Sequence, residues 1–274
     1  MKKTILITGA SSGIGKATAI LFQQKGWNVI ATMRKPEEEK ELTALENVLV
    51  TRLDVTDVNS ITKAVALGIE KFGKIDVLLN NAGYGAYGPL EATPLEKIER
   101  QFGTNVIGLL NTTKAVLPHF RENKSGVIIN ISSIGGKITF PLGTLYHGTK
   151  FAVEGLSEAL HYEMKTIGVR VKIVEPGMVM TDFGGRSFDF SNNESLTEYQ
   201  KLVQDVFTWF GSIQSGSPAS AIGEVIYTAA TDNSDQLRYA AGKDAEMLLA
   251  KRHAEDDATF INDIRTQIVK LAVQ

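Results

Sequence analysis

Two residues that can move a proton lie four positions apart in the middle of the chain. Tyr146 and Lys150 occur in Tyr-His-Gly-Thr-Lys, a spacing that places both side chains on one face of a helix. A free phenol titrates at about 10 and is a poor acid–base group at neutral pH. A neighbouring ammonium favours the phenolate and lowers the pKa of Tyr146. The pair predicts a tyrosine that exchanges a proton with a substrate oxygen; an exposed helix pair is the alternative.

A serine that could stabilise an oxyanion precedes this pair. Ser133 lies 13 residues before Tyr146, at the end of Asn-Ile-Ser-Ser. Its hydroxyl can donate a hydrogen bond to a carbonyl oxygen and stabilise negative charge that develops there. The adjacent Ser132 points to the opposite side if the strand continues through it. Ordinary capping of the strand end is the alternative role for both serines.

A glycine-rich turn near the N-terminus suits an anion. Thr8–Gly15 follows the apolar run Thr4–Ile7 and precedes the helical pattern Lys16–Lys25. Glycine lacks a Cβ, so the backbone can turn sharply and approach a phosphate, while N–H groups at the helix start face the anion. This context predicts a dinucleotide pyrophosphate site; a plain tight connection is the alternative. The residues expected to form the site are Gly9, Ser11, Ser12, Gly13, Ile14 and Gly15.

Strand and helix patterns alternate along most of the chain. The expected strands are Thr4–Ile7, Asn28–Met33, Val48–Leu53, Ile75–Asn80, Gly126–Ser132, Val169–Glu175 and Leu237–Ala241. The expected helices are Lys16–Lys25, Pro36–Leu45, Val58–Phe72, Pro94–Phe120, Tyr146–Ile167, Leu196–Phe210, Ala219–Ala230 and Asp257–Leu271. This alternation predicts an α/β fold, a single domain over residues 1–274 with a doubly wound, Rossmann-type parallel sheet and helices on both faces. Ligands bind such sheets beyond the carboxyl ends of the strands.

The composition is that of an ordinary soluble globular protein, with 274 residues, 43% hydrophobic and 22% charged. The formal net charge of -2 gives no reason to expect nucleic acid or a membrane surface as a partner. No apolar stretch approaches the ~20 residues that span a bilayer. The chain has no cysteine, which excludes disulfides, thiolate zinc sites and cysteine nucleophiles and fits a reducing, cytoplasmic location. His119, His161 and His253 show no ligand spacing, so we expect no catalytic metal.

The last third of the chain is less regular. Residues 183–216 mix Gly, Ser, Asn and aromatic residues, and we expect a mobile substrate flap that carries the short helix Leu196–Phe210. Phe207, Trp209 and Phe210 could close over a pocket. The side chains expected near the pocket mouth are Tyr84, Tyr87, Phe140, Leu142, Met178, Met180 and Phe183. This lining suits a bulky apolar or aromatic carbonyl compound; core packing or a subunit contact is the alternative.

Four motifs, in order along the chain, resemble those of the short-chain dehydrogenase/reductase family. They are Thr-Gly-x-x-x-Gly-x-Gly at 8–15, Asn-Asn-Ala-Gly at 80–83, Tyr-x-x-x-Lys at 146–150 and Pro-Gly-x-x-x-Thr at 176–181. The resemblance covers roughly residues 3–182. It implies the expected fold and an enzyme that transfers hydride between a nicotinamide and a ketone or secondary alcohol.

The resemblance also implies a catalytic tetrad. Its members are Asn105, Ser133, Tyr146 and Lys150. Ser133 would orient the substrate, Tyr146 would be the general acid/base, and Asn105, rather than the competing Asn111, would hold a water near the lysine. His147 and Thr149 depart from the pattern, in which small residues are more usual at these positions. We expect His147 at the surface; a position facing the pocket or a subunit contact is the alternative.

Further cofactor contacts follow from the same resemblance. NAD-preferring relatives carry an acid near the end of the second strand, where this chain has Met33 followed by Arg34. A guanidinium pairs well with a 2′-phosphate, so NADP(H) is favoured over NAD(H); a solvated arginine is the alternative. Asp54 is expected at the adenine amino group and Val55 at a ring nitrogen. Capping of the next helix is the alternative for Asp54, although Asp57 is better placed for it.

The nicotinamide end has its own expected contacts. The Val179 backbone and the Thr181 hydroxyl would bind the carboxamide and fix which face of the ring meets the substrate. The remaining expected cofactor-binding residues are Asn80, Ala82, Gly83, Tyr146, Lys150, Pro176 and Gly177.

We interpret the chain as an NADPH-dependent carbonyl reductase, or ketoreductase. Within the family, the alternative is an NAD-linked hydroxysteroid- or retinol-type alcohol dehydrogenase. A non-catalytic dinucleotide sensor is a remote alternative, because a sensor would not need the whole tetrad. The expected partner is a small carbonyl or alcohol substrate, bulky and apolar, with no nucleic acid or membrane. The family also implies a homodimer or homotetramer formed through Pro94–Phe120 and Tyr146–Ile167.

Overall fold

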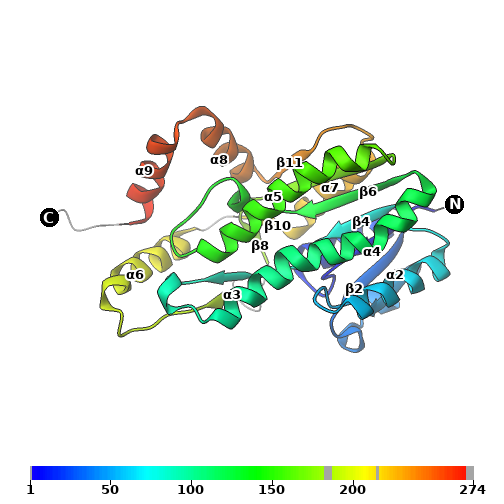
Figure 1. Ribbon diagram of the computed structural model, residues 1–274, viewed down its shortest axis with the longest axis horizontal. Coiled ribbons are helices and arrows are strands. Elements are labelled where there is room, and N and C mark those ends of the chain that lie inside the picture. The colour runs from blue at the N-terminus through cyan, green and yellow to red at the C-terminus, as the bar shows by residue number, and fades with distance from the viewer. Residues whose placement is uncertain (1, 182–186, 214–215, 270–274) are drawn as a thin grey trace.

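The computed structural model describes residues 2–181, 187–213 and 216–269 (Figure 1). Within these ranges the centre is a sheet of seven parallel strands in the order β11-β7-β6-β4-β1-β2-β3. The strands are β1 (Thr4–Ile7), β2 (Asn28–Met33), β3 (Val48–Arg52), β4 (Val77–Asn80), β6 (Gly126–Ile131), β7 (Val169–Pro176) and β11 (Arg238–Ala241). The chain runs outward to β3 on one side and to β11 on the other, so the order reverses between β1 and β4. This is the predicted doubly wound sheet, and the reversal is where such sheets bind ligands.

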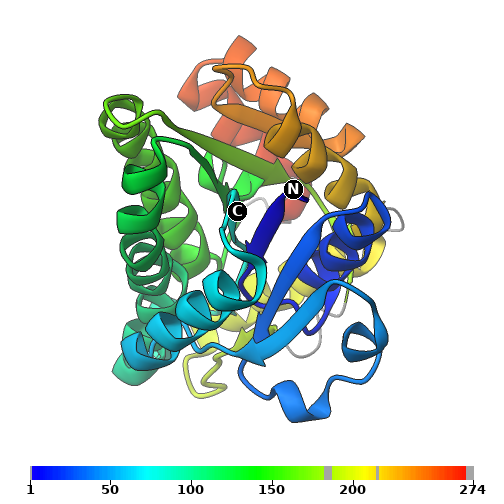
Figure 2. The same ribbon diagram turned by 90° about the vertical axis from the view of Figure 1, so that its right-hand side faces the viewer.

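Different helices cover the two faces of this sheet, which lies between them in Figure 2. One face packs against α1 (Gly13–Gln24) and α7 (Ala219–Thr231). The other face packs against α2 (Val58–Phe72), α4 (Gly108–Asn123) and α5 (Thr144–Lys165). The predicted arrangement, with helices on both faces, is therefore confirmed.

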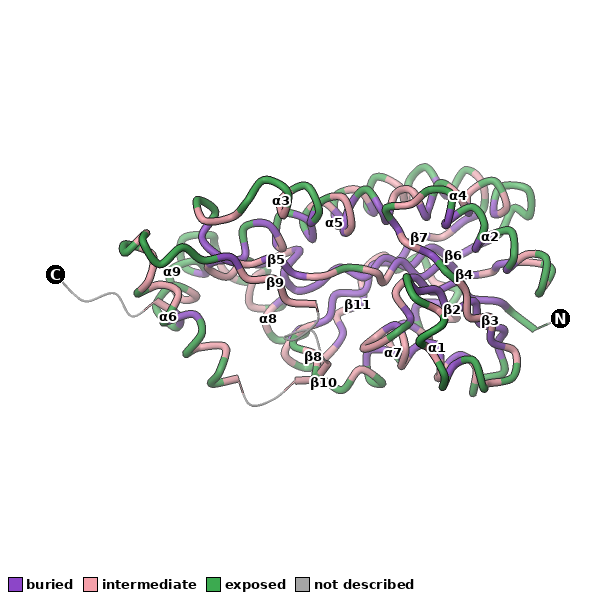
Figure 3. The backbone as a smooth tube through the Cα atoms, turned by 90° about the horizontal axis from the view of Figure 1, so that it is seen from below, coloured by how far each residue is buried: buried purple, intermediate pink, exposed green. Residues whose placement is uncertain are grey.

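The core lies on both faces of β1 because successive strand side chains point in opposite directions. Ile5 and Ile7 belong to the cluster on the α1–α7 side, together with Phe22, whereas Leu6 packs with Ile61 on the other side. Strands covered on both faces are mostly apolar, and every residue of β1 and β2 is buried. Figure 3 shows these strands as purple tube in the interior of the molecule.

The remaining elements lie beyond the carboxyl ends of the strands, toward the left in Figure 1. They are β5 (Gly85–Tyr87), α3 (Leu95–Phe102), β8 (Val179–Met180), β9 (Phe188–Phe190), α6 (Thr197–Ser212), β10 (Ser217–Pro218), α8 (Lys243–Ala254) and α9 (Asp257–Ile268). β5 pairs with β9 and β8 pairs with β10. These two short ribbons, which the sequence pattern did not predict, connect distant parts of the chain around the site.

One predicted helix is wrong. Residues Pro36–Leu45 form two separate 3-10 turns, Pro36–Glu38 and Leu42–Ala44, instead of one helix. The Glu39 carboxylate accepts hydrogen bonds from two backbone N–H groups that follow it in the chain. A continuous helix would need those N–H groups for its own ladder, so the side chain competes with helix formation.

A second predicted helix is interrupted. The expected helix Pro94–Phe120 is observed as α3 and α4 with a π turn, Gly103–Ile107, between them, and it continues to Asn123. Gly108, which follows the turn, lies close to the segment after β3: a Cβ added there would be 2.6 Å from Val55 Cγ2. Single π turns in helices are frequent at functional sites.

The C-terminal region matches the sequence pattern less closely. Helix α8 was not predicted, because it is mostly polar and buries only Ala245 and Leu249. Helix α9 confirms the predicted start at Asp257, and its predicted last residue, Leu271, lies outside the described residues.

Candidate active site

The glycine turn forms a cradle at the start of α1. Gly9 and Gly13 have φ angles of 68° and 54°, a left-handed conformation that glycine adopts without a steric penalty. A Cβ added to Gly15 would lie 2.6 Å from Asn81 Nδ2 and still closer to the carbonyl oxygen of Gly9. The predicted glycines are therefore needed where they stand.

Two residues outside the predicted set hold this cradle. The Asn81 side chain donates hydrogen bonds to the carbonyl oxygens of Thr8 (2.9 Å) and Gly9 (3.1 Å). In return, the Thr8 hydroxyl accepts from the backbone N–H groups of Asn81 (2.9 Å) and Ala82 (3.0 Å). The end of β4 is thereby bonded to the glycine turn. The signal was present in the Asn-Asn-Ala-Gly motif, but sequence alone does not say which asparagine does this.

The neighbouring Asn80 has a different role from the one expected. Its side chain is buried and donates to Thr113 Oγ1 and Asn130 Oδ1, both at 2.9 Å. The amide is thus used to join β4 to α4 and β6. Its predicted contact with a cofactor stays a prediction.

The predicted cofactor segments converge on one edge of the sheet. A Cβ on Gly9 would be 3.0 Å from Ala82 Cα, and a Cβ on Gly13 would be 3.5 Å from Thr181 Cγ2. The first turn of α1 carries no acidic residue, so nothing there repels an anion. A bare glycine backbone at a helix start fits a dinucleotide pyrophosphate.

Arg34 and Asp54 are the side chains predicted to contact the adenosine part of the cofactor. Arg34 follows β2 directly, is exposed, and has no ion-pair partner among the described residues. The Asp54 carboxylate accepts hydrogen bonds from the Thr56 N–H (3.0 Å) and hydroxyl (2.7 Å). Asp57, as anticipated, caps α2, accepting from the Ser60 N–H. The adenine contact of Asp54 remains a prediction.

The Pro176–Thr181 turn is held by a residue that the sequence did not point to. Asp244, near the start of α8, accepts a hydrogen bond from the Met178 N–H at 2.6 Å. Gly177 is packed so closely on this carboxylate that a Cβ would collide with it. Val179 then pairs in the β8–β10 ribbon. The sequence did not indicate Asp244 because this residue follows the turn by more than 60 residues and lies in a helix without an apolar pattern.

Ser133, Tyr146 and Lys150 come together at the end of β6. The Ser133 hydroxyl accepts from the Gly135 N–H at 3.0 Å and caps a 3-10 turn; it is also hydrogen-bonded to Tyr146. Lys150 Nζ donates to the Ile131 carbonyl oxygen at 2.8 Å and lies 5.8 Å from the centre of the Tyr146 ring. The helix spacing and the serine therefore meet as the sequence predicts.

The electrostatics of this group differ from the expectation. Burial raises the pKa of Tyr146 above its ordinary value, although the hydrogen bond from Ser133 opposes the rise. Burial also lowers the pKa of Lys150 to about 8, partly offset by the charge of Glu154. The loss of water around the phenol is thus the largest influence on the pKa of Tyr146, and a lowering by the lysine together with an oxidised nicotinamide stays a prediction. At neutral pH the phenol keeps its proton.

The geometry favours Asn105 over Asn111. Asn105 is buried in the π turn, where its Oδ1 accepts from the Tyr84 N–H at 3.1 Å. Its Nδ2 donates to the Tyr84 carbonyl oxygen (2.9 Å) and to Thr149 Oγ1 (3.1 Å). The asparagine therefore joins the segment after β4 to the helix that carries Tyr146, whereas Asn111 is only partly buried.

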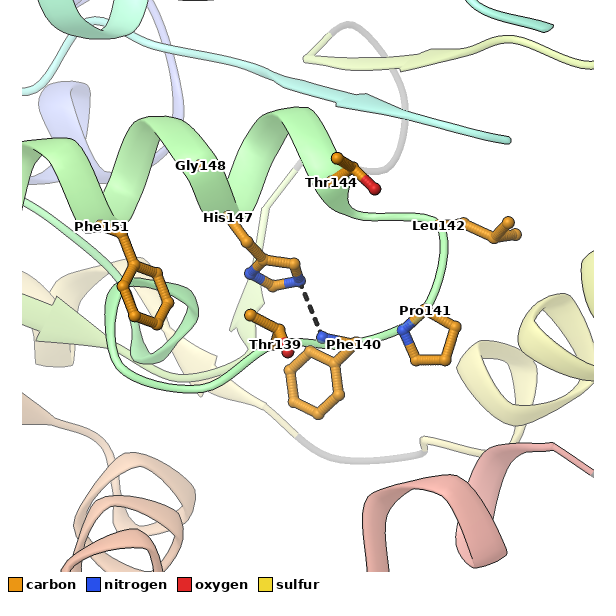
Figure 4. Close-up of a pocket in the computed structure, with 8 residues that line it drawn as sticks. All are labelled: Thr139, Phe140, Pro141, Leu142, Thr144, His147, Gly148 and Phe151. Atoms are coloured by element: carbon orange, nitrogen blue, oxygen red, sulfur yellow. Dashed lines mark hydrogen bonds between the residues drawn. The ribbon is translucent and has the colours of Figure 1, made fainter. Parts of the chain in front are cut away.

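The expectation of a surface position for His147 is wrong. Its side chain is 3% exposed, and both ring nitrogens lie at 3.0 Å from backbone groups of the 133–143 loop. Apolar burial needs partners for both nitrogens, which the loop provides. Figure 4 shows the ring facing Phe140 beside an open groove of about 440 Å³. The groove is lined by Thr139, Phe140, Pro141, Leu142, Thr144, His147, Gly148 and Phe151.

Aromatic side chains from distant segments enclose Tyr146. The Tyr87 ring stacks on Tyr146, with ring centroids 5.4 Å apart, and on Phe188, with centroids 5.2 Å apart. The Phe210 ring contacts Tyr87 edge-on. We call Tyr87, Phe188 and Phe210 the aromatic wall. Trp209 packs on Phe140 at 5.2 Å.

Other predicted pocket residues lie apart from the aromatic wall. Phe207 packs edge-on against Phe190 rather than Tyr87, and Met180 is 62% exposed. Phe183 lies outside the described residues.

Ion pairs join β9 to α3: the Asp189 carboxylate of β9 pairs with Lys97 of α3 at 2.6 Å and with Arg100 of the same helix.

Among the described residues we looked for groups that could hold a metal ion and for helices that could span a membrane. No group of three or more His, Asp or Glu side chains there is arranged to hold a metal ion. None of the helices there combines the length and apolar character that a membrane span needs.

Comparisons with known proteins agree with this geometry. The model of the short chain dehydrogenase family matches residues 3–191. An uncharacterized oxidoreductase of Schizosaccharomyces pombe is 50% identical over 239 residues, which is 86% of this chain and 99% of that protein. The solved structure of a short-chain dehydrogenase from Streptomyces avermitilis has a TM-score of 0.81 and 33% identity, covering 97% of this chain and 98% of that one. ElxO with NADP bound has a TM-score of 0.72 and 30% identity, covering 88% and 98%. Some solved neighbours contain NADP and another contains NADH.

Proposed function

Because the chain belongs to the short-chain dehydrogenase family, we propose that it is an NADPH-dependent carbonyl reductase acting on a bulky apolar ketone. One observation carries the proposal: Ser133, Tyr146 and Lys150 meet at the carboxyl edge of the sheet. The loss of water around the phenol raises the pKa of Tyr146 above its ordinary value, which agrees with a phenol that keeps its proton at neutral pH. A protonated phenol is the form that reduction of a carbonyl requires.

The residues divide the chemistry among themselves. When bound, the reduced nicotinamide supplies hydride to the carbonyl carbon. Ser133 donates a hydrogen bond to the carbonyl oxygen and stabilises its developing charge. Tyr146 then transfers its phenolic proton to that oxygen. Lys150, with a pKa lowered to about 8, stabilises the phenolate that remains and helps to reprotonate it.

The same proposal assigns the cofactor contacts. The N–H groups of the glycine turn would hold the pyrophosphate, Arg34 the 2′-phosphate, and Val179 and Thr181 the carboxamide. The exposed guanidinium without an ion-pair partner among the described residues supports NADP(H), as does the NADP bound in a solved relative with 30% identity. NAD(H) with a hydroxysteroid- or retinol-type alcohol is the alternative.

We further propose that residues 1–274 act as one catalytic domain with a substrate flap at 183–216. Exposed apolar side chains just before α4 and on α5, Ile107 at 52% and Phe151 at 45%, support a homodimer or homotetramer formed through the predicted segments Pro94–Phe120 and Tyr146–Ile167. A cytoplasmic location is part of the same proposal.

The test is consumption of NADPH and NADH with aromatic ketones, keto esters and steroid ketones, using the wild type and Tyr146→Phe. We expect turnover with NADPH, reduced about 10²–10⁴-fold in the variant, while NADPH binding measured by fluorescence is unchanged. Equal turnover in both proteins would overturn the role of Tyr146. Tight NADPH binding without any turnover would favour the sensor.

A further inference from the structure

The buried histidine beside the proposed acid is placed to control the loop that carries the proposed oxyanion donor. His147 directly follows Tyr146 on α5, yet its ring turns to the 133–143 loop (Figure 4). Nε2 accepts a hydrogen bond from the Phe140 N–H at 3.0 Å. Since Nε2 accepts, the proton of the neutral ring is on Nδ1, which donates to the Gly135 carbonyl oxygen at 3.0 Å.

The ring fits a slot that only glycines allow. A Cβ added to Gly135 would lie 2.7 Å from Nδ1, and a Cβ added to Gly143 would lie 2.5 Å from Nε2. Such distances are too short for real side-chain contacts. The loop therefore has glycines on both sides of the ring, and the histidine fixes the loop at both Gly135 and Phe140.

A single residue, Gly135, connects His147 to the reacting groups. The carbonyl of Gly135 accepts from His147, and the N–H of the same residue donates to the Ser133 hydroxyl at 3.0 Å. Ser133 in turn is bonded to Tyr146. A shift of Gly135 would move the serine relative to the tyrosine, and small misplacements of catalytic groups lower rates strongly.

We propose that His147 is a positioning residue: its neutral ring clamps the 133–143 loop to α5 and so sets the distance between Ser133 and the acid Tyr146. This inference rests on the proposed reductase function. The clamp requires a neutral His147 ring, because a proton on Nε2 would point at the Phe140 N–H and break that hydrogen bond. Burial keeps the ring neutral by lowering its pKa to about 4.

Among the described residues, the groups around the ring include no charged partner. Tyr87 of β5 and Phe140 of the loop contact it through their rings, at 6.2 Å and 5.7 Å between centroids. Tyr146, its neighbour on α5, lies at 5.6 Å. The two backbone bonds are therefore the polar interactions that hold the ring in this orientation.

The experiment uses three variants that remove different parts of the clamp. His147→Phe keeps a ring but loses both bonds; His147→Gln offers an oxygen that can reach the Phe140 N–H; His147→Asn offers a donor near Gly135. His119→Phe is the matched control, since His119 also accepts from a backbone N–H, that of Ile75 at 3.1 Å, but lies on α4.

We expect His147→Phe to lower kcat by about 10- to 100-fold while the Kd for NADPH changes less than twofold. Gln and Asn should each recover part of kcat, and His119→Phe should keep the wild-type value. Hydrogen exchange gives a readout independent of turnover: the Phe140 amide should lose protection in His147→Phe and regain it in His147→Gln.

Two results would overturn the inference. One is a folded His147→Phe with wild-type kcat. The other is a loss of kcat that follows the loss of NADPH binding and thermal stability in parallel, with no recovery by Gln or Asn, which would mean a merely structural role. An inactive wild type would instead contradict the proposed function and leave the exchange at Phe140 to decide whether the clamp exists.

Discussion

The glycine turn at 8–15 and the aromatic wall around Tyr146 are assembled in different ways. The turn is shaped by backbone: left-handed glycines form it within a short local sequence, and the Asn81 amide, just after β4, holds it in place. The wall is shaped by side chains that come from β5, β9 and α6, more than 100 residues apart between Tyr87 and Phe188. A backbone site tolerates no added atom, whereas a wall of rings can be altered one ring at a time. The glycine turn should therefore bind one kind of group, whereas the aromatic wall can be adapted to different substrates.

The largest expected effect is at the backbone site. Gly15→Ala would place a Cβ 2.6 Å from Asn81 Nδ2 and against the Gly9 carbonyl, so the turn must open. We expect NADPH affinity to fall more than about 100-fold, measured by fluorescence titration. Gly155→Ala, where an added Cβ meets nothing within 4 Å, is the control and should bind normally. Normal binding by Gly15→Ala would mean that the turn is not the pyrophosphate site.

A smaller effect is expected where the cofactor end depends on a side chain. Arg34→Asp removes a charge-assisted pair with a 2′-phosphate and adds a repulsive one. The ratio of kcat/KM for NADPH to that for NADH should fall about 10- to 100-fold. Arg52→Asp, at the end of the neighbouring strand, serves as a control of equal charge change. An unchanged ratio in Arg34→Asp would contradict the NADP(H) preference.

Beneath the Pro176 turn, a buried carboxyl predicts a pH effect on stability. Burial and the charge of Glu154 raise the pKa of Glu175 to about 7, against the opposing charges of Lys137 and Arg238. The folded state then binds more protons than the unfolded state between pH 4.5 and 7, so stability falls as pH rises through this range.

Glu175→Gln, which stays neutral, should remove that decline. We expect it to be more stable than the wild type by about 1–3 kcal/mol at pH 8 and similar at pH 4, in urea unfolding at both pH values. An identical decline in both proteins would show that Glu175 does not cause it.

The smallest effect is expected at the substrate end. Truncating Trp209 and Phe210 to Ala removes ring contacts with Phe140 and Tyr87, each worth about 0.5–1.5 kcal/mol. KM for large ketones should rise about tenfold, with little change for small ketones and for NADPH. Phe207→Ala, whose ring packs on Phe190, should leave KM near the wild-type value. Unchanged kinetics in the double variant would exclude these rings from the pocket.

The same contrast explains what the sequence could predict. The sheet, the glycine turn and the Tyr146–Lys150 pair follow from local patterns, because the strands are mostly apolar and helix spacing aligns i and i+4, and the family resemblance adds Ser133. Tyr87 and Phe210 were predicted near the pocket from their aromatic character, but their stacking with Phe188 was not. Asp244 and Phe188 could not be predicted, since they reach the site from distant segments without a local pattern. His147 was predicted wrongly because polar residues in helices are usually exposed, and only the fold reveals that two glycines make room for its ring.

The most direct test of the account is transfer of deuterium from the cofactor to the product. NADPH carrying deuterium at either of the two C4 positions is supplied with the ketone that reacts fastest in the panel, and the alcohol is analysed by mass spectrometry. We predict deuterium on the carbinol carbon from one C4 position only, because the 176–181 turn, if it binds the carboxamide as proposed, would present a single face of the ring. Deuterium from neither position, or equally from both, would contradict hydride transfer at a fixed site.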